Sequence, residues 1–124
     1  MSKYIHPATL EAALQVASNL LPDDRREVTE GHGHDPENAL VVGINNCDSV
    51  YFKVPNGKIA GMAGVHNNGQ IWMLCTDAIY DYPHTFAREA KRYVNARTEK
   101  LLWNIVDERN KVHLKLLRFL GFRF

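Results

Sequence analysis

The chain has 124 residues, of which 45% are hydrophobic, and its formal net charge is +1 at pH 7. This length fits one globular domain spanning residues 1–124, and the small net charge gives no strong signal for binding nucleic acid. The N-terminal residues lack the pattern of a signal peptide, and no apolar run approaches the ~20 residues of a membrane span. We therefore expect a soluble protein with no membrane partner.

Two helices are predicted in the first third of the chain. Apolar residues recur at helical spacing over residues 10–21, and Pro7 stands near the expected start. The segment DDRREVTEGHG predicts a second, shorter helix that ends at Gly31. The following GHGHDPE, residues 31–37, is expected to be a loop.

Neither the histidine nor the cysteine spacing predicts a metal site. His32 and His34 form an H-x-H pair in a glycine-rich loop, but no third ligand stands at an evident spacing. Cys47 and Cys75 are far apart and do not form a C-x-x-C motif. We therefore expect no metal, and we expect both thiols to be buried in apolar strands.

From Ala39 onward the pattern changes to that of strands. ALVVGIN, SVYFKV, KIAGMAGVH and QIWMLCTD are strand-like runs, and PNG and NNG between them predict tight turns of an antiparallel meander. Pro83 and the spacing of Phe86, Ala90 and Tyr93 then predict a helix. This helix should cross back, so that residues 101–106 form a buried strand parallel to the preceding one.

The last quarter of the chain predicts a strand, a helix and a returning aromatic pair. Asn110 can cap the helix because its side chain accepts hydrogen bonds from first-turn amides, and Gly121 suits the left-handed position that ends it. The predicted order is α-α-β-β-β-α-β-α-β. This is an α+β fold with a mainly antiparallel central sheet flanked by helices.

The closing pattern N-x-x-H-x-x-L-L-x-x-x-G-F resembles that of the GNAT superfamily of N-acetyltransferases. Asn110, Gly121 and Phe122 match the landmarks of that motif. His113 stands where the superfamily usually has a small residue. Leu117 replaces the tyrosine that often protonates the departing thiolate of coenzyme A. The resemblance implies a GNAT-like fold in which the helices and the splayed strands hold acetyl-CoA.

Within the superfamily, several segments are similar to the small internal virion or core proteins of short-tailed bacteriophages. They are DRREV, KIAGMAGV, IWMLCTD, the helix from His84, and LLWNIVDERNKVHLKLLRFLGF. The resemblance implies an internal virion or morphogenesis protein, with phage virion proteins or a host protein as partners. Its location would be the host cytoplasm during infection and then the virion. The alternative is an active acetyl-CoA-dependent N-acetyltransferase that acts on a host protein, a phage protein or a small amine.

The resemblance also indicates which residues would hold acetyl-CoA. The candidates are Met73, Leu74, Cys75, His84, Arg88 and Asn110. The loop that should cradle the diphosphate, TDAIYDYPHTFARE, contains no glycine. It carries Asp77 and Asp81, which would repel the diphosphate, and Pro83 removes one amide donor. We therefore expect a degenerate acetyl-CoA site.

Acetyl transfer also requires a base and a group that stabilises the oxyanion. The candidate bases are Glu27 in the second helix and His66 at the end of the third strand-like run. A backbone amide near Met73 and Leu74 would stabilise the oxyanion. Each base has a structural alternative, because Glu27 can form a surface ion pair and His66 can simply end a hairpin.

Overall fold

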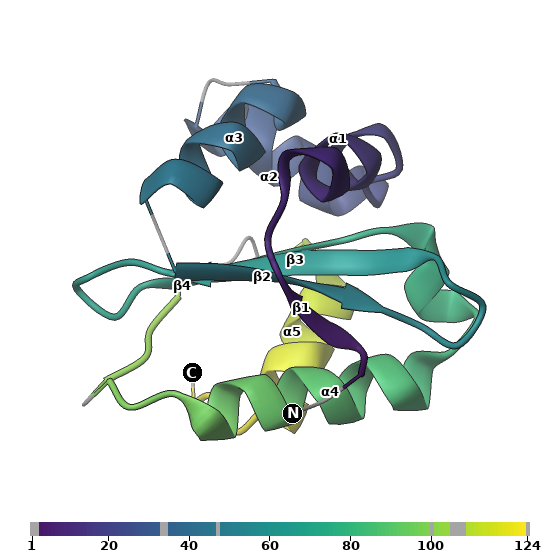
Figure 1. The fold of residues 1–124 in the computed structure, drawn as a ribbon. Coiled ribbons are helices and arrows are strands. Elements are labelled where there is room, and N and C mark those ends of the chain that lie inside the picture. Colours follow the sequence, from purple (N-terminus) through teal and green to yellow (C-terminus); the bar gives the residue numbers. More distant parts are fainter. Residues whose placement is uncertain (1–2, 33–34, 47, 100, 105–108, 124) are drawn as a thin grey trace.

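The structure is a computed structural model that describes residues 3–32, 35–46, 48–99, 101–104 and 109–123. Its elements in chain order are β1 (Ile5–Pro7), α1 (Leu10–Ser18), α2 (Pro22–His32), α3 (Pro36–Asn46), β2 (Asp48–Lys53), β3 (Ile59–Val65), β4 (Ile71–Cys75), the 3-10 helix η1 (Asp77–Tyr80), α4 (Pro83–Ala96) and α5 (Lys111–Phe119). The four strands form one antiparallel sheet in the order β1-β2-β3-β4. Helices α1, α2 and α3 cover one face of this sheet, and α4 and α5 cover the other (Figure 1). The predicted α+β class is confirmed.

The hairpins of the sheet form where the sequence predicted them. Gly57 in PNG and Gly69 in NNG have φ of 84° and 87°, which glycine adopts without the steric cost of a Cβ. Gly121, after α5, has φ of 98° and closes that helix as expected. The turns therefore fix the register of β2, β3 and β4.

The chain opens with a strand that the sequence did not predict. Ile5 in β1 lies opposite Phe52 in β2, so Pro7 belongs to an edge strand, where its missing amide is tolerated. Helix α1 begins at Leu10, and the side chain of Thr9 accepts a hydrogen bond from the backbone amide of Ala12 at 3.1 Å. The helix therefore starts later than Pro7 suggested.

The strand predicted over ALVVGIN is wrong, because these residues belong to helix α3. Asp35 accepts a hydrogen bond from the backbone amide of Asn38 at 2.8 Å, and Pro36 occupies the first turn. Leu40 and Ile44, four residues apart, turn one face of the helix toward the core beneath it. The loop expected over 31–37 is accordingly shorter, since α2 ends at His32 and α3 begins at Pro36.

Each face of the sheet has its own hydrophobic core. The core under α1 and α3 is built around these buried residues: Ala13, Val16, Ala17, Leu20, Leu40 and Met62. The larger core lies between the sheet and α4 and α5, and its aromatic centre consists of Phe52, Phe86 and Tyr93. No helix within the described ranges is both long and apolar enough to cross a lipid bilayer.

The strand predicted at 101–106 is present only as a single parallel bridge between Trp103 and Gln70 within the described residues. The parallel direction matches the prediction, while residues 105–106 lie outside the described part of the chain. Leu101 is 68% exposed and Trp103 is half-buried, so the predicted burial of this segment is wrong for these residues. Phe122 packs against the larger core without forming a strand.

Candidate functional site

The outer edge of β4, which faces away from β3, is hydrogen-bonded at both of its ends. At the start of the strand, the amide of Ile71 donates to the carbonyl of Trp103 at 2.9 Å. At its end, the amide of Cys75 donates to Oδ2 of Asp24 at 2.8 Å, and the carbonyl of Cys75 accepts from the amide of Leu21 at 3.0 Å. The start of α2 therefore occupies the end of β4.

The three strand residues predicted to bind acetyl-CoA differ in the direction of their amides. Leu74 lies opposite Met62, and the alternation of the ladder directs its amide toward β3. The amides of Met73 and Cys75 point the other way, and that of Cys75 is held by Asp24. The Cys75 thiol is buried as predicted, and burial raises its pKa well above the ordinary value. Of the three amides, that of Met73 lies on the outer edge between the two bonded ends.

Asp24 is a buried carboxylate that joins three elements. It lies in the first turn of α2 and is 3% exposed. Its Oδ1 accepts a hydrogen bond from Nδ2 of Asn110 at 2.7 Å, while Oδ2 accepts the one from Cys75. Burial raises the pKa of Asp24, and the two hydrogen bonds act in the opposite direction because they favour the ionised form.

Asn110 caps α5, as the sequence predicted, and also fixes Asp24. Its Oδ1 accepts from the backbone amide of His113 at 3.1 Å, and the side chain is 1% exposed. Its amide group donates to Asp24. The side chain is thus engaged on both sides, and its predicted role in binding acetyl-CoA stays a prediction.

Glu27 and His113 face each other beside Asp24. Oε2 of Glu27 lies 3.7 Å from Nδ1 of His113. The His113 side chain is 7% exposed, and neither of its ring nitrogens has a hydrogen-bond partner in the described part of the chain. A buried polar group left in this state costs about 1–3 kcal/mol, so it calls for an explanation. The candidate ligand atoms of Asp24, Glu27 and His113 all lie within 4.8 Å of one another.

The sequence identified one member of this cluster as functional and missed two. Glu27 is a predicted base, whereas Asp24 entered only as part of the predicted second helix and His113 only as an unusual residue of the closing motif. The signal that could have found them is the spacing of three residues that separates Asp24 from Glu27 and Asn110 from His113. Such spacing places side chains on one helix face, but it does not show that the two faces meet.

His66, the other predicted base, lies at the opposite end of β4 from this cluster. Its backbone amide bonds to the carbonyl of Gln70 at 2.9 Å, which closes the turn between β3 and β4. Asp24 and Glu27 lie at the Cys75 end of the strand. The structure therefore does not bring the two predicted bases together.

In the loop expected to cradle a diphosphate, several backbone amides donate hydrogen bonds to acceptors within the loop itself. The amide of Ala78 donates to the side-chain oxygen of Thr76 at 3.2 Å, and the amide of Ile79 donates to the Thr76 carbonyl at 3.3 Å. These two bonds form the start of η1. The amide of Asp81 donates to the carbonyl of Ala78 at 3.2 Å. The carboxylate of Asp81 lies 3.9 Å from Nζ of Lys58. This loop is therefore organised by its own hydrogen bonds.

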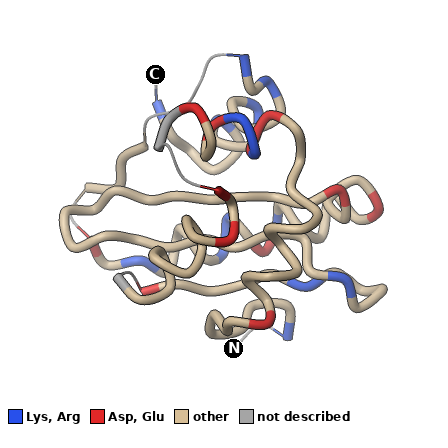
Figure 2. The backbone as a smooth tube through the Cα atoms, turned by 90° about the horizontal axis from the view of Figure 1, so that it is seen from above, with Lys and Arg blue, Asp and Glu red and all other residues tan. Residues whose placement is uncertain are grey.

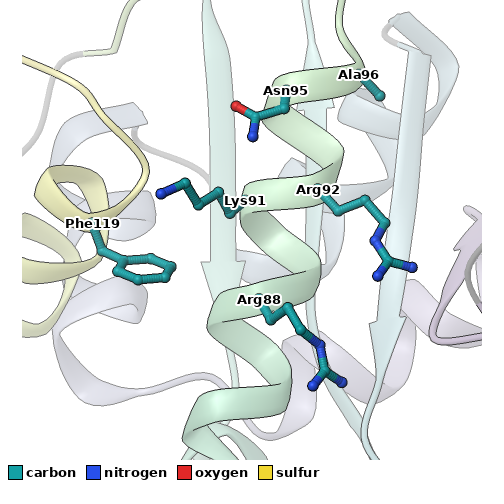
Figure 3. Close-up of a pocket in the computed structure, with 6 residues that line it drawn as sticks. All are labelled: Arg88, Lys91, Arg92, Asn95, Ala96 and Phe119. Carbon is teal, nitrogen blue, oxygen red and sulfur yellow. The ribbon is translucent and has the colours of Figure 1, made fainter.

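His84 and Arg88, the remaining predicted cofactor residues, are exposed on α4. Figure 3 shows Arg88 and Arg92 extending away from Phe119, whereas Lys91 points toward it across an open groove between α4 and α5. All three cationic side chains contact neighbouring residues of the protein. Arg88 and Arg92 lie 3.4 and 3.6 Å from the buried carboxylate of Glu89, and Lys91 lies 4.9 Å from the centre of the Phe119 ring.

Charged residues of both signs are interspersed over the backbone as it is seen in Figure 2. Lys and Arg number 15 and Asp and Glu 14 in the whole sequence. A polyanion such as nucleic acid is bound by a concentrated basic surface. The charge pattern therefore adds no support for a nucleic-acid partner.

Comparison with known proteins identifies the fold. An acetyltransferase of the GNAT family from Bacillus anthracis superposes with a TM-score of 0.63 at 11% identity, over 96% of this chain and 78% of that one. A protein assigned to the GNAT acetyltransferases, from Bordetella pertussis, gives a TM-score of 0.60 at 15% identity, over 99% of this chain and 87% of that one. No family model and no curated protein matches the sequence. The chain therefore has the GNAT fold, as its closing motif implied.

Proposed function

We propose that this protein uses the GNAT fold as a structural scaffold and does not catalyse acetyl transfer. Its role would be that of an internal virion or morphogenesis protein of a short-tailed bacteriophage, with other virion proteins as partners. Two independent features support this proposal. One is the similarity of its sequence segments to those phage proteins, and the other is the state of the β4 edge.

The observation that carries the proposal is the hydrogen bonding of Cys75. Its amide is bonded to Asp24 and its carbonyl to Leu21, so the chain itself fills the end of the edge along which acetyl-CoA would lie. A cofactor that took the Cys75 amide from Asp24 would leave this buried carboxylate with one hydrogen bond fewer. Hydrogen bonds to charged groups contribute about 1.5–3 kcal/mol each, which a cofactor would have to replace.

The loop before α4 supports the same conclusion. A diphosphate needs several amides that point outward at a helix N-terminus. Here the amides of Ala78, Ile79 and Asp81 are hydrogen-bonded to acceptors within the loop, and Pro83 at the start of α4 has no amide hydrogen. Asp77 and Asp81 add negative charge at the same place.

A thermal-shift titration with acetyl-CoA tests the proposal. A ligand at one hundred times its Kd stabilises the native state by about 2.7 kcal/mol, which corresponds to a rise of roughly 10 °C for a domain of this size. We expect no rise at millimolar acetyl-CoA and no release of free coenzyme A. An active N-acetyltransferase serves as the positive control, and a saturable rise in the melting temperature would refute the proposal.

The alternative function is an active acetyl-CoA-dependent N-acetyltransferase that modifies a protein or a small amine. The observation in its favour is the position of Glu27, whose carboxylate lies 3.7 Å from His113 beside the β4 edge. Leu117, which is buried on α5, has no hydroxyl proton to donate, so thiolate protonation would fall to water or to another group. In that case Glu27→Gln should lower the rate of coenzyme A release by about 10²- to 10⁴-fold.

The virion role has its own test. Antibodies against the chain should detect it in particles purified from infected cells, after washing steps that remove an abundant host cytoplasmic protein used as the control. Its absence from such particles, together with its presence in the infected cytoplasm, would contradict the proposed role.

A further inference from the structure

We propose that Asp24, Glu27 and His113 bind one divalent transition-metal cation of the Zn²⁺ type where α2 and α5 meet beyond the end of β4. The site would consist of two carboxylates from one helix and one imidazole from another. It is separate from the proposed function, which concerns acetyl-CoA and virion assembly.

The geometry of the three side chains fits one small cation. Bonds from Zn²⁺ to carboxylate oxygen and imidazole nitrogen are about 2.0–2.2 Å long, so two ligands of one tetrahedral ion lie roughly 3.3–3.6 Å apart. Oε2 of Glu27 and Nδ1 of His113 are 3.7 Å apart, close to this separation. The complete set lies within 4.8 Å, so the most distant pair would have to approach by up to about 1.5 Å to share one tetrahedral ion.

The unpaired ring nitrogens of His113 are the observation that points to a bound metal ion. The His113 side chain is only 7% exposed, and both of its ring nitrogens lack a hydrogen-bond partner among the described residues. An imidazole nitrogen with a free lone pair is the commonest metal ligand in proteins. Coordination by Nδ1 would explain why this nitrogen is buried opposite two carboxylates and has no other partner.

The surroundings orient the first ligand. Asp24 receives one hydrogen bond on each oxygen, from Cys75 and from Asn110, and each oxygen keeps a further lone pair for a metal. Asn110 also holds the backbone amide of His113 at 3.1 Å, so one side chain positions two ligands. Such outer contacts are typical of metal sites, because they fix the ligands before the ion arrives.

The ligand set indicates the class of ion. Mixed oxygen and nitrogen ligands suit Zn²⁺, Mn²⁺ and Fe²⁺ better than Mg²⁺ or Ca²⁺, which prefer oxygen alone. Three protein ligands leave one position of a tetrahedral ion open for water or for another molecule. A metal-free ion pair between Glu27 and protonated His113 is the competing explanation of the same contact.

Titration calorimetry of Zn²⁺ into the EDTA-treated full-length chain distinguishes these explanations. We expect one Zn²⁺ per chain, with at least tenfold weaker binding in Glu27→Gln and in His113→Leu. The matched control is Glu30→Gln, one turn further along α2. The carboxylate of Glu30 is 61% exposed and pairs with Arg109, so this variant should bind like the wild type.

The melting temperature gives a second readout, because Zn²⁺ bound only by the native state must raise it. The rise should be present in the wild type and in Glu30→Gln, and lost in Glu27→Gln and His113→Leu. Circular dichroism shows whether each variant folds. If one of the two site variants does not fold, the result for the other site variant tests the proposal. Absence of saturable binding to the wild type, or binding by a folded site variant as tight as that of the wild type, would overturn the proposal. No acetyl-CoA is present, so the result is independent of the scaffold proposal.

Discussion

Replacing Phe52 with alanine should lower the free energy of unfolding by about 3–5 kcal/mol, the range for removing a large aromatic side chain from a core. Phe52 in β2 is 0% exposed. Its ring packs edge to face against Phe86 and Tyr93 of α4, with centroids 5.7 and 5.8 Å away. Aromatic pairs of this kind add about 0.5–1.5 kcal/mol beyond the burial of their area. Urea denaturation at equilibrium measures the loss.

Tyr80→Ala is the control for this experiment, because Tyr80 is an aromatic residue that is 60% exposed in η1. Exposed positions without special contacts usually change stability by no more than about 0.5 kcal/mol. If Phe52→Ala cost as little as this control, α4 would not pack on the sheet in the way described.

The elements predicted best from sequence were those with local signals at both ends. Helix α5 has its cap at Asn110 and its stop at Gly121, and α4 has Pro83 and a clear apolar stripe. The two hairpins were marked by glycines that take positive φ. Such signals are read within a few residues, so they do not depend on the rest of the fold.

The errors arose where the apolar residues of a segment showed neither the alternation of a strand nor the spacing of a helix. ALVVGIN is compatible with a buried strand and with a buried helix, and Asp35 and Pro36, a few residues before it, were the signals that should have decided for α3. Residues 5–7 of β1 are too few to show alternation. Trp103 suggested a core position, but its indole nitrogen instead donates to the carbonyl of Asn68 at the hairpin surface.

The candidate site could be predicted only in part, because it depends on contacts between distant segments. Asn110 was predicted as a cap, yet its bond to Asp24 spans 86 positions of the chain. The bond from Cys75 to Asp24 spans 51. A sequence shows that each residue is polar and on a given helix face, whereas tertiary packing decides that α2 and α5 meet at the end of β4.

Replacing Asp24 with leucine should therefore destabilise the fold by about 2–4 kcal/mol, although leucine has a similar size and is apolar. The substitution leaves the amide of Cys75 and Nδ2 of Asn110 without their acceptor in a buried place. Each unsatisfied buried donor costs about 1–3 kcal/mol. Relief from burying a carboxylate offsets part of this cost, which is why the expected loss is below the sum of the two. Denaturant unfolding in the presence of EDTA measures this loss without a contribution from bound metal.

Asp23→Leu provides the matched control, because it makes the same chemical change one residue earlier in α2. Asp23 is 38% exposed and forms an ion pair with Arg26 at 2.8 Å, and exposed pairs of this kind contribute at most about 1 kcal/mol. The difference between the two variants then isolates the buried bonds that tie α2 to β4 and α5. Equal losses in the two variants would mean that Asp24 does not hold these elements together, and the energetic argument against a cofactor at the end of β4 would be lost.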